Sequence, residues 1–383
     1  MDKENMRLNC LFICLLAISV IIFVADKAVS VAATSISTCA ELQNIKNDLS
    51  GIYYLTSDID CTDTSTWNAG AGFEPIGTNT TPFTGTLDGK HHAISSLYIN
   101  RPDPWPNYVD VGLFGFIDDG CIIKNLGMIN VDITGASRAG ALVAITGLIA
   151  DINISNCHAS GSVSGGYGVG GLVGYNRGGS ISHSYSTAAV FGDGDIYDYT
   201  GGFVGINNHG GEVTLCFSTG NVTASGSRSG GFAGSNTGMI RECFATGNVN
   251  GEHSVGGFVG ENDSTTVNGH FAGSIRNSYA IGNVSGTDWV GGFVGINWGV
   301  QSLTSVIENC YSVGNVTGST NTGGFVGRVG DPYEVNNCYW DTQTSSQSSS
   351  AAGYGKTTAE MKQQATYISW NFNRIWDITE SIN

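Results

Sequence analysis

Two groups of closely spaced aspartates are the residues of this chain best suited to hold a metal ion. Asp193, Asp195 and Asp198 lie in an insertion between two regular segments, and a second group lies between Asp58 and Asp63. Because carboxylate oxygens are ligands that Ca²⁺ prefers, the first group is the candidate calcium site. Neither group has the spacing of a known calcium loop, so solvated acidic turns are the alternative for both. Apart from calcium, the sequence predicts no cofactor.

Catalytic residues are not indicated by any motif. The seven histidines include no His-Glu-x-x-His pattern, the signature of zinc metallopeptidases. The sequence also lacks the Gly-x-Ser-x-Gly nucleophile motif, and no acidic cluster contains the Arg or Lys that a lyase would use as its base. We therefore predict a protein that is not an enzyme.

Seven of the ten cysteines fall into two classes. Cys39 and Cys61 lie outside the repeated pattern, and they are the disulfide candidate in a chain whose export would permit disulfides. Five others share one repeat position, which holds Leu126 in another copy: Cys157, Cys216, Cys243, Cys310 and Cys338. They are predicted to face the interior as small hydrophobic side chains, with a disulfide or metal role as the alternative.

The first 33 residues have the pattern of an export signal. Lys3 and Arg7 precede the apolar run Leu8–Ala25, and small residues follow up to Ala33. We predict that residues 1–33 are a signal peptide, or else an N-terminal membrane anchor, which would be the only contact with a membrane. The protein is therefore expected to be secreted or displayed on the cell surface.

Charge and composition exclude other classes. The formal net charge is -16, and the 16 Lys and Arg residues form no basic run, so nucleic acid is excluded as a partner. The apolar share of 41% and the aromatic share of 10% exclude a disordered chain. The 56 glycines among 383 residues indicate a repeat.

A pentapeptide of the type Gly-Gly-Phe-Val-Gly is that repeat. Its eight copies, two of them degenerate, begin at Val111, Gly140, Gly170, Gly201, Gly230, Gly256, Gly291 and Gly323. A second motif, such as Ile240–Val249, supplies another short apolar run in the same period. Short strands at a period of about 30 residues, without amphipathic helices, predict an all-β fold: a parallel β-solenoid, or β-helix, of about eight or nine coils.

Equivalent positions of successive coils are predicted to form ladders on the inward face of the strands. One aromatic ladder starts at Leu172 and continues through Phe203, Phe232, Phe258, Phe293 and Phe325. The other comprises Tyr185, Phe217, Phe244, Tyr279, Tyr311 and Tyr339, and His158 holds its position in an earlier coil. An asparagine ladder of turn residues comprises Asn176, Asn207, Asn236, Asn262 and Asn297.

Short helices are expected to cap both ends of the solenoid. Thr38–Glu41 and Thr357–Glu360 each have the Thr-x-x-Glu pattern of a helix capping box. The predicted organisation is a signal peptide at 1–33, an N-terminal cap and first coil at 34–110, the repeats at 111–340 and a C-terminal cap at 341–383.

The repeats resemble a known family. Gly-Gly-Phe-Val-Gly-x-Asn followed by Ile-x-Asn-Cys-Tyr-Ser-x-Gly-Asn-Val is similar to the GLUG repeat of bacterial and archaeal surface proteins. GLUG repeats also accompany some IgA-specific metallopeptidases, whose peptidase motif this chain lacks. The resemblance implies a scaffold and does not define an activity.

Together these observations favour an exported, non-catalytic β-solenoid that acts in cell-surface adhesion or in binding. The expected partner is an extracellular glycan or a surface protein. The alternative is a carbohydrate-active β-helix enzyme, either a polysaccharide lyase or a glycoside hydrolase, because such enzymes share the predicted architecture.

Overall fold

Short strands separated by glycine and asparagine wind into successive coils. The computed structural model describes residues 32–102, 109–148, 151–194, 198–265 and 269–377. Residues 34–383 form one structural unit, distinct from residues 1–33. The predicted signal peptide lies outside the described residues except for Ala32 and Ala33. Within the described part of the chain, no helix has the length and apolarity needed to cross a membrane.

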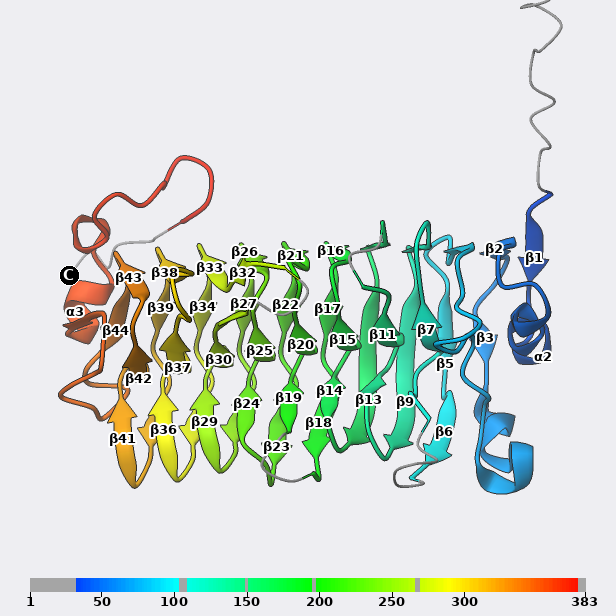
Figure 1. Cartoon of the computed structure of the whole chain (residues 1–383), viewed down its shortest axis with the longest axis horizontal. Helices are drawn as coiled ribbons and strands as arrows, with labels where there is room; N and C mark the ends of the chain where they lie inside the picture. Colours follow the sequence, from blue (N-terminus) through cyan, green and yellow to red (C-terminus); the bar gives the residue numbers. More distant parts are fainter. Residues whose placement is uncertain (1–31, 103–108, 149–150, 195–197, 266–268, 378–383) are drawn as a thin grey trace, which may run out of the picture. The chain divides into compact units, whose positions relative to one another are not determined.

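Four parallel sheets run along the solenoid, and each coil contributes to them in turn (Figure 1). The first sheet has 11 strands in the described residues: β1 (Thr34–Ile36), β2 (Ile52–Leu55), β4 (Thr86–Asp88), β8 (Ile122–Lys124), β12 (Asn153–Ser155), β16 (Ser180–Ser182), β21 (Glu212–Thr214), β26 (Met239–Arg241), β33 (Ser274–Arg276), β38 (Ser305–Glu308) and β43 (Tyr333–Asn336).

The second sheet follows in each coil and has the most strands, because most coils contribute two strands to it. Its strands are β3 (Ile59–Asp60), β5 (Ala93–Ser95), β6 (Tyr98–Arg101), β9 (Gly127–Gly135), β13 (His158–Gly165), β17 (Tyr185–Ser186), β18 (Ala189–Gly192), β22 (Phe217–Ser218), β23 (Val222–Ala224), β27 (Phe244–Ala245), β28 (Val249–Asn250), β34 (Tyr279–Ala280), β35 (Val284–Ser285), β39 (Tyr311–Ser312), β40 (Val316–Thr317), β44 (Tyr339–Asp341) and β45 (Tyr354–Lys356).

The third and fourth sheets complete each coil. The third contains β10 (Ala139–Gly140), β14 (Gly168–Gly170), β19 (Tyr199–Gly201), β24 (Arg228–Gly230), β29 (His253–Gly256), β36 (Asp288–Gly291) and β41 (Thr320–Gly323). The fourth contains β7 (Phe114–Ile117), β11 (Val143–Thr146), β15 (Val173–Asn176), β20 (Val204–Asn207), β25 (Ala233–Asn236), β30 (Val259–Asn262), β37 (Val294–Trp298) and β42 (Val326–Gly330). One antiparallel pair, β31 (Ser264–Thr265) with β32 (Phe271–Ala272), lies in the longest insertion.

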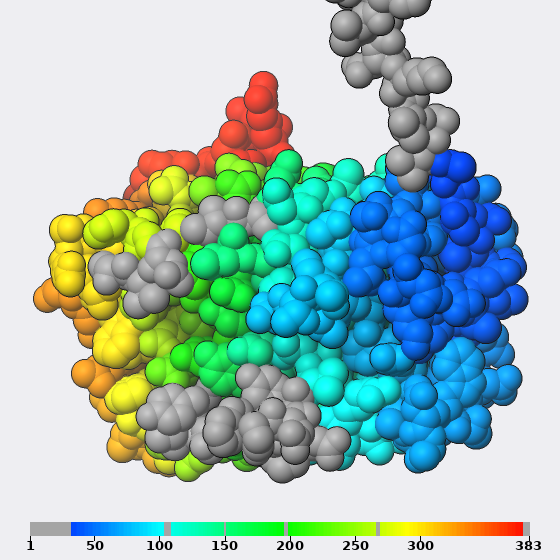
Figure 2. All heavy atoms as spheres, turned by 45° about the vertical axis from the view of Figure 1, so that its right-hand side comes forward, coloured from blue at the N-terminus to red at the C-terminus, as the bar shows by residue number. Residues whose placement is uncertain are grey.

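The fold prediction is confirmed: the chain is a parallel β-solenoid of about nine turns. Strand pairing begins at Thr34, which lies opposite Tyr53, so parallel pairing reaches into the segment predicted as the N-terminal cap. The space-filling view shows the coils as bands in sequence order, each against its neighbours (Figure 2). Contacts therefore join neighbouring coils, as in other solenoids.

The pentapeptide forms the corner between the third and fourth sheets. A side chain at Gly230 would place its Cβ 2.0 Å from the carbonyl oxygen of Ala233, which no residue but glycine tolerates. The phenylalanine of each pentapeptide points inward, and Phe203, Phe232, Phe258 and Phe293 stack on the next ring with centroids 4.9 Å apart. The first predicted ladder is thus the core of the molecule.

The predicted asparagine ladder is present, but its residues lie buried at the ends of strands of the fourth sheet rather than in turns. Asn176, Asn207, Asn236 and Asn262 are buried, and each donates from Nδ2 to the Oδ1 atom of the next asparagine over 2.7–2.9 Å. These bonds satisfy amide groups that would otherwise be costly to bury.

Both predicted capping boxes are present. Helix α2 (Cys39–Gln43) is capped by Thr38 and Glu41, and helix α3 (Thr358–Met361) by Thr357 and Glu360. Three 3₁₀ segments complete the helical structure of the described residues: η1 (Asn44–Asn47), η2 (Thr62–Gly70) and η3 (Gln364–Thr366).

Candidate ligand-binding surface

The predicted calcium residues do not converge in the described part of the chain. Asp193 is exposed, whereas Asp198 is only 1% exposed, and Asp195 lies outside the described residues. Among the described residues, no group of three or more His, Cys, Asp or Glu side chains is arranged to hold a metal ion. Calcium binding by this insertion stays a prediction.

The cysteines occupy the two environments that the sequence distinguishes. Cys39 and Cys61 form a disulfide with their Cα atoms 5.4 Å apart, joining helix α2 to the end of β3. Cys157, Cys216 and Cys243 are buried free thiols, as are the remaining ladder cysteines Cys310 and Cys338. Burial raises the pKa of the Cys157 thiol to about 12, so it stays protonated and unreactive at neutral pH.

The second aromatic ladder corrects our expectation, because it lies on the outer face of the second sheet. Tyr185, Phe217, Phe244, Tyr279 and Tyr311 are half-buried, while the small residues beside them in the chain, such as Ser186 and Cys243, are fully buried. Successive side chains of a strand point to opposite faces, so an aromatic residue that follows an inward cysteine must point outward. We call these five rings, together with His158, the outer ladder.

The outer ladder is a regular stack of parallel rings. The centroids of His158 and Tyr185 are 4.8 Å apart at 10°, and those of Phe217 and Phe244 are 4.8 Å apart at 1°. Each internal ring therefore has a neighbour on both faces, and the stack presents mainly ring edges to solvent. A planar ligand gains access to ring faces only where this regularity ends.

The regularity ends at Tyr311, because the C-terminal segment folds back over the coils there (Figure 1). Trp376 contacts Tyr279 and Tyr311 at centroid distances of 6.3 and 5.8 Å, and Trp370 contacts Tyr311 at 6.1 Å. Tyr339 instead packs edge-on against Tyr367, at 5.3 Å and 81°. The Trp370 indole anchors this segment by donating to the carbonyl oxygen of Asn337 over 2.9 Å.

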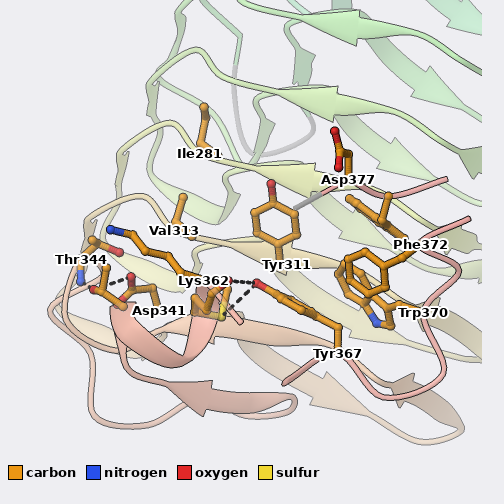
Figure 3. Close-up of a pocket in the computed structure, with 13 residues that line it drawn as sticks. Ile281, Tyr311, Val313, Asp341, Thr344, Lys362, Tyr367, Trp370, Phe372 and Asp377 are labelled. Carbon is orange, nitrogen blue, oxygen red and sulfur yellow. Dashed lines mark hydrogen bonds between the residues drawn. The ribbon is translucent and has the colours of Figure 1, made fainter. Parts of the chain in front are cut away.

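A cavity of about 380 Å³ opens where the stack ends (Figure 3). Tyr311 stands at its centre, with Ile281 and Val313 from the same outer face. Its other aromatic lining residues come from the C-terminal segment: Tyr367, Trp370, Phe372 and Trp376. Its polar lining residues are Asp341, Thr344, Thr358, Lys362 and Asp377.

Hydrogen bonds fix one side of the cavity. The Asp341 carboxylate accepts from the backbone N–H of Gln343 over 2.9 Å and from the Thr358 hydroxyl over 2.7 Å. The Tyr367 hydroxyl donates to the carbonyl oxygen of Met361 over 2.6 Å, and burial raises the pKa of Tyr367 to about 12. These hydrogen bonds fix the side chains before a ligand binds, so binding does not have to meet the entropic cost of ordering them.

Two side chains that line the cavity carry a hydrogen-bond donor without a partner in the described part of the chain, and the Trp376 donor is itself shielded from solvent. Within the described residues, neither the Tyr311 hydroxyl nor the buried Trp376 Nε1 has a hydrogen-bond partner. Burial, with the nearby Tyr279 and Tyr367, raises the pKa of Tyr311, so its hydroxyl keeps its proton. An aromatic cavity with unsatisfied donors suits a ligand that has both apolar faces and hydroxyl groups.

Sequence reasoning missed this cavity although a signal for it was present. The adjacency of Cys310 and Tyr311 shows that the two side chains face opposite ways, which would have placed the ladder outside. No local pattern, however, predicts that Trp370 and Trp376 return to cover Tyr279 and Tyr311, since those contacts join distant parts of the chain.

Comparison with known families identifies the repeats. The family described as the GLUG motif matches residues 165–190, 225–250 and 251–285. Similar proteins include halomucin of Haloquadratum walsbyi, 39% identical over 40% of this chain, and an immunoglobulin A1 protease of Streptococcus sanguinis, 29% identical over 48%. A candidate glycine-rich membrane protein of Evansella cellulosilytica is 32% identical over 37% of this chain. The matches span only 2%, 9% and 19% of these relatives, respectively.

Solved structures show the same fold. A candidate immunoglobulin A1 protease from Bacteroides ovatus is 19% identical, with a TM-score of 0.50 over 90% of this chain and 89% of that one. An IgA1 protease structure gives a TM-score of 0.51 at 19% identity, over 90% of this chain and 25% of that one. Residues 165–190, 225–250 and 251–285 therefore match the GLUG motif, and they lie within a β-solenoid.

Proposed function

We propose that this chain is an exported, non-catalytic scaffold that binds glycans through the cavity at the end of the outer ladder. The observation that carries the proposal is the cavity itself, where five aromatic side chains converge and the hydroxyl of one of them, Tyr311, has no hydrogen-bond partner among the described residues. The aromatic walls can stack on the apolar faces of a sugar ring, while the Tyr311 hydroxyl donates to a sugar oxygen and the carboxylates of the rim accept from sugar hydroxyls.

The cellular setting supports a surface role. The first 33 residues have the pattern of an export signal. The relatives named halomucin and glycine-rich membrane protein are surface-type proteins by name. A glycan-binding solenoid displayed on one cell would act in adhesion, because binding a glycan of another surface joins the two surfaces.

A glycan fits the cavity better than a protein partner does. Protein interfaces of standard size bury about 800 Å² on each partner, whereas this cavity is only about 380 Å³ in volume. Its rim carries one cationic side chain, Lys362, and the carboxylates Asp341 and Asp377, so it does not select a strongly charged ligand. A single neutral sugar unit matches this size and charge.

The test uses the fluorescence of the two tryptophans that line the cavity. We expect Tyr311→Phe, which removes only the hydroxyl, to weaken the binding of a neutral oligosaccharide several-fold, and Tyr311→Ala to weaken it at least about tenfold. Fluorescence titration with cello-, xylo-, manno- and malto-oligosaccharides measures both effects.

Tyr185→Ala is the matched control, because Tyr185 is a ring of the same outer ladder far from the cavity. It should leave the affinity unchanged. Equal losses in the two alanine variants would show that only solenoid stability changed. Turnover of any of the oligosaccharides would instead support the carbohydrate-active enzyme.

A further inference from the structure

A second groove of about 270 Å³ crosses four coils on the outer face of the second sheet. It runs over β23, β28, β35 and β40, and its residues Asn283 and Asn315 follow the cavity residues Ile281 and Val313 by two positions. Every lining residue is uncharged: Asn221, Val222, Thr223, Asn248, Val249, Asn250, Asn283, Val284, Ser285, Asn315 and Thr317. The valines point inward, so the outward surface consists of two polar rows.

The first row is an exposed asparagine ladder. The Oδ1 atom of Asn221 accepts from the backbone N–H of Asn248 over 3.0 Å, and Asn248 accepts in the same way from Asn283, which accepts from Asn315. These bonds hold each amide in one orientation. The Nδ2 groups of Asn221, Asn248 and Asn283 have no hydrogen-bond partner among the described residues, so their donors are free at a spacing of about 4.8 Å per coil.

The second row lies two residues further along each strand. Strand register places Thr223 beside Asn250, Asn250 beside Ser285 and Ser285 beside Thr317. Among the described residues, the side chains of Thr223, Asn250 and Ser285 make no hydrogen bond to the protein. The first row thus presents oriented amide donors, and at Thr223, Asn250 and Ser285 the second row presents hydroxyl and amide groups that are not hydrogen-bonded to the described residues.

We infer that this groove binds a linear, neutral polysaccharide that lies along the coils. The inference rests on the proposed function and adds a second site with a polymeric ligand. A formal net charge of -16 repels polyanions, and the uncharged lining offers no cation to offset that repulsion. The groove also lacks the Trp, Tyr and Arg anchors typical of protein interfaces.

A repeating polymer suits this groove because one weak contact per coil becomes avidity over four coils. The ladder ends upstream at β18, where Ala189 and Phe191 occupy the two rows and Phe191 is 42% exposed. Beyond that break the second row resumes with Ser164 and Thr134, outside the groove. Those two residues provide a matched control on the same face.

The experiment is affinity electrophoresis of the chain in native gels that contain hydroxyethyl cellulose, galactomannan or laminarin, with alginate as the polyanionic comparison. We expect at least one neutral polymer to retard the wild-type chain. The variant with Thr223→Ala, Asn250→Ala, Ser285→Ala and Thr317→Ala should bind that polymer at least about tenfold more weakly. The control with Thr134→Ala and Ser164→Ala should bind it as the wild type does.

A second groove variant, Thr223→Val with Thr317→Val, keeps side-chain shape and strand propensity and should still weaken retardation several-fold. Retardation equal to wild type in both groove variants, or equal retardation by alginate, overturns the inference. If Tyr311→Ala alone then abolishes retardation, the proposed function stands without the groove. If no neutral polymer retards the wild-type chain and no oligosaccharide enters the cavity, both fail.

Discussion

The two aromatic ladders have nearly the same ring spacing but opposite surroundings. Phe232 and Phe258 of the inner ladder stack at 4.9 Å and are fully buried, whereas Phe217 and Phe244 of the outer ladder stack at 4.8 Å and are half-buried. The spacing follows from the rise between coils, which is the same on both faces of a sheet. Ring stacking therefore does not distinguish core from surface in a solenoid.

Chemical variety distinguishes the two ladders. From Phe203 to Phe325 every inner ring is phenylalanine, because the core admits no hydroxyl without a partner. The outer ladder contains histidine, phenylalanine and tyrosine, since its edges reach solvent. Only this face can change its side chains without loss of the core, and it is also the face that carries the cavity.

The largest expected effect is a loss of folding stability, and it should be greater for the inner ladder than for the outer ladder. We expect Phe258→Ala to lower the free energy of unfolding by about 3–5 kcal/mol, because it opens a cavity between two buried rings. Phe244→Ala should lower it by about 1–2 kcal/mol, from lost stacking and partial burial. Urea unfolding of both variants measures the difference. Equal losses would mean that the outer ladder contributes to the core as much as the inner one.

A smaller effect is expected at the inward neighbour of Phe244. Cys243→Ser should cost about 1 kcal/mol, because a hydroxyl replaces a thiol in an apolar slot. Ser278 already occupies the equivalent slot of the next coil, where its hydroxyl donates to the carbonyl oxygen of Arg276 over 2.8 Å. Urea unfolding checks this value, and a loss as large as that of Phe258→Ala would contradict a purely packing role.

The sequence predicts most of the fold because each coil repeats the same short motifs at nearly the same spacing. The pentapeptides indicate the corners, the inner phenylalanines and the buried asparagine ladder, and Thr38 and Thr357 indicate the caps. These features depend on contacts within one coil or between neighbouring coils. The residues that make such contacts recur with the repeat, so the sequence pattern identifies them.

The candidate site is harder to predict from the sequence because it forms where the repeats end. Asp193 and Asp198 are close in the chain, yet one is exposed and the other is buried, a difference in environment that their spacing does not indicate. The cavity depends on Trp370 and Trp376 meeting Tyr311 from a segment without repeats. Non-local packing of this kind leaves no periodic signal.

The smallest expected effect tests the titratable ring of the outer ladder. His158 stacks on Tyr185 and lies over Gly127, and burial lowers its pKa below the usual value of about 6.5. The unfolded chain then binds more protons than the folded chain at acidic pH. The contribution of His158 to stability is therefore complete above about pH 6.5 and declines as the pH falls through that value.

His158→Phe removes this titration and continues the stack with the ring type of Phe217 and Phe244. We expect the variant and the wild type to differ little in stability at pH 8, and the variant to be the more stable at pH 5. His209, whose pKa burial also lowers, titrates in both proteins and cancels in the difference. Unfolding curves at a series of pH values measure that difference. If it does not change with pH, His158 is as solvated in the folded chain as in the unfolded one, and the outer ladder does not extend to it.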